Sequence, residues 1–212
     1  ETFTNLLTRS EVKLKTPRTK RNWVDQLTDE SSDLFKNDVS LADYKEAINS
    51  QADVCIDIFT KPIAILAGGA GTGKSTVATA YINGVKQVDG QGASICVLAP
   101  TGKAADRLRT DLQHKDITSG VNVSTIHSIL AENRWLNPNM TTKRVGGESI
   151  ERYSTIVIDE CSMIDTTLFA SFVRAINWDC VTRILLVGDP AQLPPIGYGK
   201  VYADFVSFLT VN

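Results

Sequence analysis

The sequence predicts an α/β fold, with a mainly parallel sheet and helices on both of its faces. Four short apolar runs, at residues 63–67, 94–99, 155–158 and 183–187, have the length of buried strands and end in polar residues or glycine. Helix-forming segments alternate with these runs, and that alternation favours a sheet of parallel strands. Parallel strands covered on both faces are apolar almost throughout rather than at every second residue, as these runs are.

The segment before the first strand divides into a linker and a helix. We interpret residues 1–39 as a linker or the edge of a preceding domain, and residues 40–212 as the α/β domain. Residues 1–21 are basic and lack a clear period, so they form either a solvated tail or an arm that contacts phosphates. Ser40 is typical of a helix cap, and we expect a helix from there to about residue 59, beside the loop that follows the first strand.

Composition excludes several classes of protein. The net charge of the 212 residues is only −2, which indicates neither disorder nor a strongly basic nucleic-acid-binding tail. No apolar run approaches the roughly 18 residues of a membrane span, and the first residues lack the apolar core of a signal peptide, so we expect a cytoplasmic protein without a membrane partner. The four cysteines are widely spaced and there are two histidines, so we interpret the cysteines as reduced and structural rather than as zinc ligands. Because the first residue is Glu rather than Met, we expect a longer polypeptide.

A glycine-rich loop follows the first predicted strand and precedes a helix-forming run at residues 75–86. Residues 68–76 read Gly-Gly-Ala-Gly-Thr-Gly-Lys-Ser-Thr, the pattern of a phosphate-binding loop. Glycines let backbone N–H groups turn towards phosphate oxygens, and the following helix presents its positive end to the same anion. Lys74 is placed to reach the β- and γ-phosphates, and the Ser75 hydroxyl is placed to bind Mg²⁺. A glycine-rich turn that binds nothing is the alternative, but it would not require strand, loop, Lys-Ser and helix in this order. The candidate nucleotide-binding residues of the loop are Gly69, Ala70, Gly71, Thr72, Gly73, Lys74, Ser75 and Thr76.

Polar residues also follow the last two predicted strands. Asp159 and Glu160 come directly after residues 155–158, where Asp159 can hold Mg²⁺ through water and Glu160 can act as general base for an attacking water. Gln192 lies beyond residues 183–187. Its amide both donates and accepts hydrogen bonds, so it can contact the γ-phosphate and the attacking water together. The simpler alternatives are a chance Asp-Glu pair and a polar turn stiffened by proline.

Two further segments are candidates for contacts to a nucleic-acid strand. Thr101 and Lys103 lie at the start of a predicted helix, whose N-terminal end can hold a phosphate. A helix simply capped by Thr101 is the alternative. Thr125 and His127 end another apolar segment, where they either contact a sugar-phosphate backbone or serve in capping and packing.

Five motifs, taken together and in order, resemble those of superfamily 1 DNA helicases, and the RecD-like branch is the closest match, with related patterns in Dda-type and Pif-type helicases. The motifs read GGAGTGKST, APTGKAADRL, STIHSIL, IVIDECSMID and LLVGDPAQLPPIGYGKV, and the resemblance covers about residues 45 to 206. It implies a RecA-like P-loop NTPase domain that uses ATP and Mg²⁺, with single-stranded DNA and fork duplex as partners. Members of this family move 5′ to 3′ along the strand and unwind duplexes in replication, repair and recombination. The resemblance further implies a bacterial or phage-infected cell.

The resemblance also assigns roles to residues. Gln51 is the candidate for adenine recognition, and Lys74, Glu160 and Gln192 are the candidate catalytic residues. Candidate contacts to single-stranded DNA are Pro100, Thr101, Lys103, Thr125 and His127. Helicases of this family need a second RecA-like domain, which supplies arginines to the γ-phosphate. Because the sequence stops at residue 212, just beyond the first domain's last motif, we expect this chain alone to hydrolyse ATP poorly.

An insertion at residues 134–152 lacks a helical period and contains two turn signals. In the resembled family a small hairpin emerges here and can split the duplex, with Trp135 or Met140 as an apolar surface for an unstacked base. A plain surface excursion is the alternative. For the whole protein, two other functions stay open: an RNA helicase of the same superfamily, and a nucleotide-gated scaffold whose catalysis is dispensable.

Overall fold

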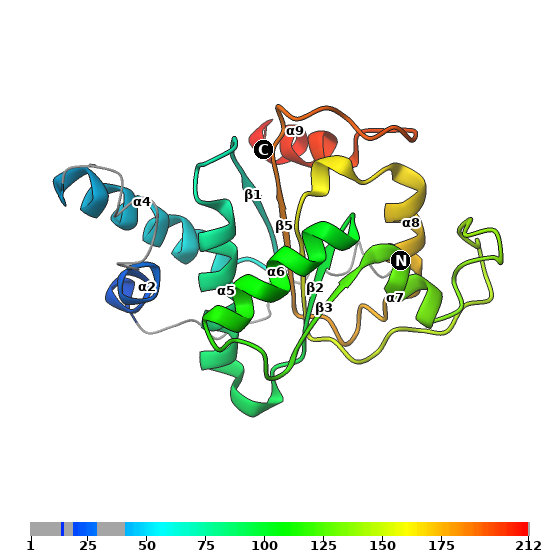
Figure 1. The fold of residues 1–212 in the computed structure, drawn as a ribbon, viewed down its shortest axis with the longest axis horizontal. Helices are drawn as coiled ribbons and strands as arrows, with labels where there is room; N and C mark the ends of the chain where they lie inside the picture. The colour runs from blue at the N-terminus through cyan, green and yellow to red at the C-terminus, as the bar shows by residue number, and fades with distance from the viewer. Residues whose placement is uncertain (1–13, 15–18, 29–40, 212) are drawn as a thin grey trace.

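The computed structural model describes residue 14, residues 19–28 and residues 41–211, and its centre is a five-stranded sheet (Figure 1). The strand order is β1-β5-β4-β2-β3, and every neighbouring pair is parallel. The strands are β1 (Ile63–Ala67), β2 (Ile95–Ala99), β3 (Val121–Thr125), β4 (Thr155–Ile158) and β5 (Arg183–Gly188). The predicted fold class is confirmed.

Helices cover both faces of this sheet (Figure 1). On one face lie α2 (Lys20–Leu27), α4 (Leu41–Phe59), α5 (Lys74–Asp89) and α6 (Gly102–His114). On the other lie α7 (Ile126–Glu132), α8 (Thr166–Ala175) and α9 (Val201–Val211), and two short 3₁₀ turns, η1 (Gly90–Gly92) and η2 (Cys161–Met163), connect elements. No helix in the described part of the chain is long and apolar enough to cross a membrane.

Alternate residues of each central strand belong to different cores. In β2, Ile95 and Val97 pack into the core beneath α5, whereas Cys96 and Leu98 pack into the core beneath α7 and α8. Both sets are fully buried. This arrangement explains why the strands are apolar at successive residues, since side chains along a strand point alternately to opposite faces.

The sequence did not predict β3 as a strand. It pairs with β2 alone, at the edge of the sheet, and all five of its residues are only partly buried. Asn122, Ser124 and Thr125 are therefore tolerated there. The other four strands were predicted from continuous apolar runs. β3 has no such run, so it was not predicted.

Part of the segment interpreted as a linker is a docked helix. Trp23 of α2 is buried and packs edge-on against Phe59, with 5.1 Å between the ring centroids. A methyl group at Gly84 would overlap the same indole, so α2 also contacts α5 closely. The predicted helix near residues 40–59 is present as α4, while its expected cap, Ser40, and most of the basic segment 1–21 lie outside the described residues.

The insertion between α7 and β4 contains a short antiparallel turn, with a bridge between Leu136 and Thr142. Trp135 is 7% exposed, and its indole N–H donates to the carbonyl of Glu148 at 2.8 Å. It therefore belongs to the core, and the hypothesis that it offers a surface for an unstacked base is wrong for this conformation. Met140, at the tip, is 59% exposed.

All four cysteines are free thiols. Burial raises the pKa of both Cys55 and Cys96 to about 12, so these thiols stay protonated at neutral pH. Inert, protonated thiols agree with a structural role.

Candidate active site

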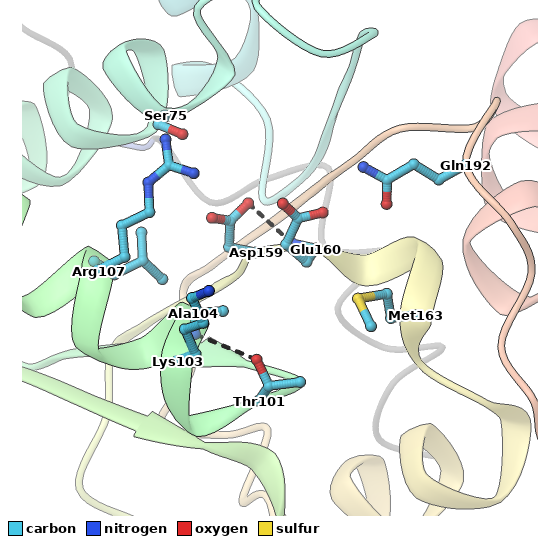
Figure 2. Close-up of a pocket in the computed structure, with 10 residues that line it drawn as sticks. Ser75, Thr101, Lys103, Ala104, Arg107, Asp159, Glu160, Met163 and Gln192 are labelled. Atoms are coloured by element: carbon cyan, nitrogen blue, oxygen red, sulfur yellow. Dashed lines mark hydrogen bonds between the residues drawn. The ribbon is translucent and has the colours of Figure 1, made fainter.

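The carboxyl ends of the parallel strands meet along one edge of the sheet, and most of the predicted site residues follow them. A cavity of about 370 Å³ opens there (Figure 2). Its lining comes from the phosphate loop, the segment after β4, the loop after β5 and the first turns of α6. The lining residues are Ser75, Thr101, Lys103, Ala104, Arg107, Leu108, Asp159, Glu160, Met163 and Gln192. A crevice at this edge is where open α/β sheets bind ligands.

The phosphate loop connects β1 to α5 through two residues in the left-handed region. Gly71 and Gly73 have φ angles of 77° and 81°, and Gly73 is the N-cap of α5. Lys74 folds back over the loop, and its ammonium group donates to the carbonyls of Gly68 and Gly69 at 2.7 Å each. The loop is thus closed around its own lysine, whose charge lies where the predicted phosphates would bind.

Gln51 reaches this loop from α4. A methyl group at Gly73 would overlap Gln51 Nε2, so the glycine provides the space for the amide. Gln51 Oε1 is buried and has no hydrogen-bond partner among the described residues. A buried polar atom without a partner costs free energy unless a ligand or water satisfies it. The structure therefore brings Gln51 together with the phosphate loop, in agreement with the resemblance.

Asp159 and Glu160 lie at the end of β4, facing the same cavity (Figure 2). Asp159 Oδ1 accepts the backbone N–H of Glu160 at 2.9 Å. Glu160 has a left-handed backbone, with φ of 51°, and begins the turn η2. Such a conformation costs a non-glycine residue of order 1–3 kcal/mol and is common at functional sites. Glu160 Oε2, like the amide oxygen of Gln51, is buried without a hydrogen-bond partner among the described residues.

The electrostatics of the carboxylate pair favour an incoming cation. Burial raises the pKa of Asp159, and the nearby negative charge of Glu160 adds to this rise. The positive charges of Lys74 and Arg107 oppose it without cancelling it. Two adjacent carboxylates with incomplete compensation are stabilised when a divalent cation binds beside them.

Gln192 contacts the turn η2, which directly follows Glu160. Ser162 Oγ donates to Gln192 Oε1 at 3.1 Å, and this bond does not use the amide N–H₂ group. Asp189 Oδ1 accepts the N–H of Ala191 at 2.9 Å and shapes the loop. The amide of Gln192, from the loop after β5, and the carboxylate of Glu160, from the end of β4, border the same cavity (Figure 2).

The two candidate strand-contacting segments lie at neighbouring strand ends, since Ala99 of β2 is paired with Thr125 of β3. Thr101, which follows Pro100, caps α6 by accepting the N–H of Ala104 at 3.2 Å. Thr125 caps α7 by accepting the N–H of Ser128 at 3.0 Å. Both capping alternatives are therefore present in the structure. Thr101 and Lys103 line the cavity, whereas Thr125 and the half-buried His127 do not.

Sequence reasoning missed Arg107 and Met163, which also line the cavity. Arg107 comes four residues after Lys103 on α6, and residues four apart share a helix face. That spacing was the available signal for Arg107. Met163 follows the carboxylates on η2 and supplies an apolar wall.

The residues present fit a nucleoside triphosphate with Mg²⁺. Lys74 and Arg107 are cationic, Gly69 and Gly71 leave room for oxygen atoms, and buried oxygen atoms of Gln51 and Glu160 have no hydrogen-bond partner among the described residues. The described residues contain no cluster of three His, Cys, Asp or Glu side chains. Such a cluster is not needed for Mg²⁺, which keeps most of its waters and takes phosphate oxygens with one or two protein ligands.

A strand, a glycine-rich loop ending in Lys-Ser, a helix and a strand-end carboxylate pair define a P-loop nucleotide-binding domain. The chain belongs to the AAA domain family, whose pattern matches residues 51–198. It is 32% identical over 163 residues to the RecBCD enzyme subunit RecD of Haemophilus influenzae, covering 70% of this chain and 24% of that protein.

Two further relatives show the same kind of partial match. The ATP-dependent RecD2 DNA helicase of Deinococcus radiodurans is 32% identical over 155 residues, which cover 70% of this chain and 18% of the relative. An uncharacterized protein of Methanocaldococcus jannaschii, MJ1519, is 30% identical over 173 residues, which cover 79% of this chain and 14% of the relative. The chain thus spans less than a quarter of the length of these relatives. The predicted relation to RecD-like helicases of superfamily 1 is confirmed.

Proposed function

We propose that this chain is the first of two motor domains of an ATP-dependent DNA helicase, which couples ATP hydrolysis to 5′-to-3′ movement along single-stranded DNA and to duplex unwinding. One observation supports this most strongly. A single cavity is bordered by the phosphate-loop residue Ser75, by the carboxylates of Asp159 and Glu160, and by the start of α6. Groups suited to phosphoryl transfer and a helix end suited to a strand phosphate are therefore neighbours.

Each residue has a distinct task in hydrolysis. When bound, Mg-ATP supplies a phosphoanhydride bond that water can cleave to ADP and phosphate. Lys74 releases the loop carbonyls and binds the phosphates, while Ser75 and, through water, Asp159 hold the metal. Glu160 accepts the proton of the attacking water, and Gln51 orients the adenine.

Gln192 and the strand-end segments connect hydrolysis to the nucleic acid. The Gln192 amide contacts the γ-phosphate and so responds to its presence. Thr101 and Lys103, preceded by Pro100, hold the strand at the end of β2, and Thr125 and His127 hold it at the end of β3. Closure of a second motor domain over the nucleotide and its reopening then bias movement along the strand. Without that domain's arginines, hydrolysis is expected to be about 10³- to 10⁵-fold slower.

ATP hydrolysis by the full-length protein, measured with and without single-stranded DNA, tests this proposal. We expect strong stimulation by DNA, and loss of hydrolysis in Lys74→Ala. Glu160→Gln is the matched variant, because it retains the shape of the site and should bind ATP without hydrolysing it. Hydrolysis that does not respond to any nucleic acid would contradict the helicase function, and full biological activity of Glu160→Gln would favour a nucleotide-gated scaffold.

A further inference from the structure

Arg107 lines the cavity, but the proposed function gives it no role. It is one helical turn beyond Lys103 on α6, and it borders the cavity together with Ser75 and Asp159. Its guanidinium extends from α6 towards the side of the cavity where Ser75 lies, across from the carboxylates (Figure 2). The group thus spans the space between the strand-contacting helix and the phosphate site.

The guanidinium is close enough to the carboxylates to influence them, since its charge helps to lower the pKa of Asp159 against the effect of burial. Within the described residues, Arg107 forms no hydrogen bond or ion pair. Its neighbour Arg109 differs: it pairs with Asp106 and donates to the carbonyl of Val123 at 3.0 Å. The five N–H donors of Arg107 are therefore available to a ligand.

We propose that Arg107 binds the γ-phosphate of the nucleotide and thereby links γ-phosphate occupancy to the position of α6. The inference rests on the proposed function, because it requires nucleotide in this cavity. The inner phosphates fit the loop and the N-terminus of α5, which leaves the γ-phosphate next to Asp159 and Glu160. Arg107 faces this same place. A planar guanidinium suits a terminal phosphate, which offers two oxygens to its paired donors.

The position of Arg107 on α6 gives this contact a consequence beyond affinity. Thr101 and Lys103, the candidate strand contacts, lie at the start of the same helix. A contact between Arg107 and the γ-phosphate favours one placement of α6, and its loss on hydrolysis removes that preference. The affinity of the strand site then depends on the γ-phosphate through a rigid element that both sites share.

Titration of the chain with a fluorescent non-hydrolysable ATP analogue and with the matching ADP tests the inference. We expect Arg107→Gln to lower the affinity for the analogue roughly ten- to a hundredfold, as for loss of a charge-assisted hydrogen bond. ADP affinity should stay within about twofold. The affinity of Arg107→Lys for the analogue should lie between those of the unaltered chain and Arg107→Gln, because an ammonium retains the charge but not the paired donors. Arg109→Gln, the same change two residues on, is the control and should leave the ratio of the two affinities unaltered.

A second arm measures single-stranded DNA affinity with the analogue and with ADP. In the unaltered chain the two affinities should differ, and Arg107→Gln should make them equal. Equal weakening of ADP and analogue would show a general structural role and overturn the inference, as would unchanged affinities. Weaker DNA binding without nucleotide would instead identify a strand contact, and would overturn it too. If the unaltered chain binds no nucleotide at all, the proposed function fails with it, whereas normal nucleotide binding with an unaffected Arg107→Gln contradicts the inference alone.

Discussion

Gln51 of α4 lies directly against Gly73 of the phosphate loop, and only a glycine leaves room for its amide. A methyl group at position 73 would overlap Gln51 Nε2. Gly73 also has a φ of 81°, which disfavours any side chain. The helix that precedes the first strand therefore packs against the phosphate loop, and the loop and helix are fitted to each other.

Gly73→Ala is expected to disturb both the loop and the amide. The strain of a left-handed alanine costs about 1–2 kcal/mol, and the overlap with Gln51 adds to it. We predict a loss of roughly 1–3 kcal/mol in the free energy of unfolding, with weaker ATP binding. Urea unfolding and nucleotide titration provide the two measurements.

Gly71→Ala is the matched control for that variant. Gly71 has a similar φ of 77°, but a methyl group there would meet no atom within 4 Å. It should show the strain without the overlap. Adding Gln51→Ala should restore part of the stability of Gly73→Ala and none of that of Gly71→Ala. Equal responses of the two glycine variants to Gln51→Ala would contradict the fitted contact.

Asp159→Asn is expected to stabilise the chain at neutral pH in the absence of Mg²⁺. The folded protein raises the pKa of Asp159 above its ordinary value of 3.8, mainly through burial. The folded state therefore binds this proton more tightly than the unfolded state does, and the favourable contribution is complete below pH 3.8. It is lost as pH rises through the raised pKa. Asparagine keeps the acceptor for the Glu160 N–H but has no charge to bury.

The difference in unfolding free energy between Asp159→Asn and the unaltered chain, measured from pH 3 to 7, checks this. The advantage of the variant should grow with pH and then level off. Addition of Mg²⁺ with nucleotide should reverse the order, because a ligand that binds the folded state stabilises it by mass action. A variant that is less stable than the unaltered chain at every pH would contradict the role of burial.

The strand-end residues show how much of the site could be predicted from sequence. Asp159 and Gln192 were located because each comes after a buried apolar run, and parallel strands bring such residues to one edge. Arg107 was missed because it belongs to a helix, and its direction depends on how α6 packs against the sheet. The four-residue spacing from Lys103 indicates that Arg107 shares its helix face, but it does not indicate that this face borders the cavity.

The elements missed in the fold have similar causes. The edge strand β3 is only partly buried along its whole length, so polar residues are tolerated there and no continuous apolar run marks it. Helix α2 depends on contacts distant in sequence, between Trp23 and Gly84, which no local signal displays. The resemblance offered Trp135 or Met140 as a surface for an unstacked base, whereas the Trp135 side chain is buried. Irregular backbone can contribute to the core when its polar groups find partners, as the Trp135 indole does with Glu148.

Trp135 and Met140 should have separable effects. Trp135→Ala removes a buried ring from the core beneath α7 and α8 and is predicted to cost about 3–5 kcal/mol of unfolding free energy. Met140→Ala should leave stability within about 0.5 kcal/mol, as expected at an exposed position. If the tip splits the duplex, Met140→Ala in the full-length protein should slow unwinding without lowering DNA-stimulated ATP hydrolysis. Unaltered unwinding would favour the plain surface excursion.

Lys103→Ala is expected to weaken strand binding without affecting nucleotide affinity. Lys103 is exposed at the start of α6 and lines the cavity, so it can neutralise one strand phosphate. Loss of one such contact should reduce the slope of log affinity against log salt by about 0.7 for a single strand. Lys61→Ala is the control, since Lys61 precedes β1 at the opposite edge of the sheet and pairs with Asp57. If Lys103→Ala leaves the salt dependence of strand binding unchanged, the start of α6 does not contact the strand, and Thr101 serves only as a helix cap. In a competition experiment, an RNA strand that binds as well as DNA would favour the RNA helicase.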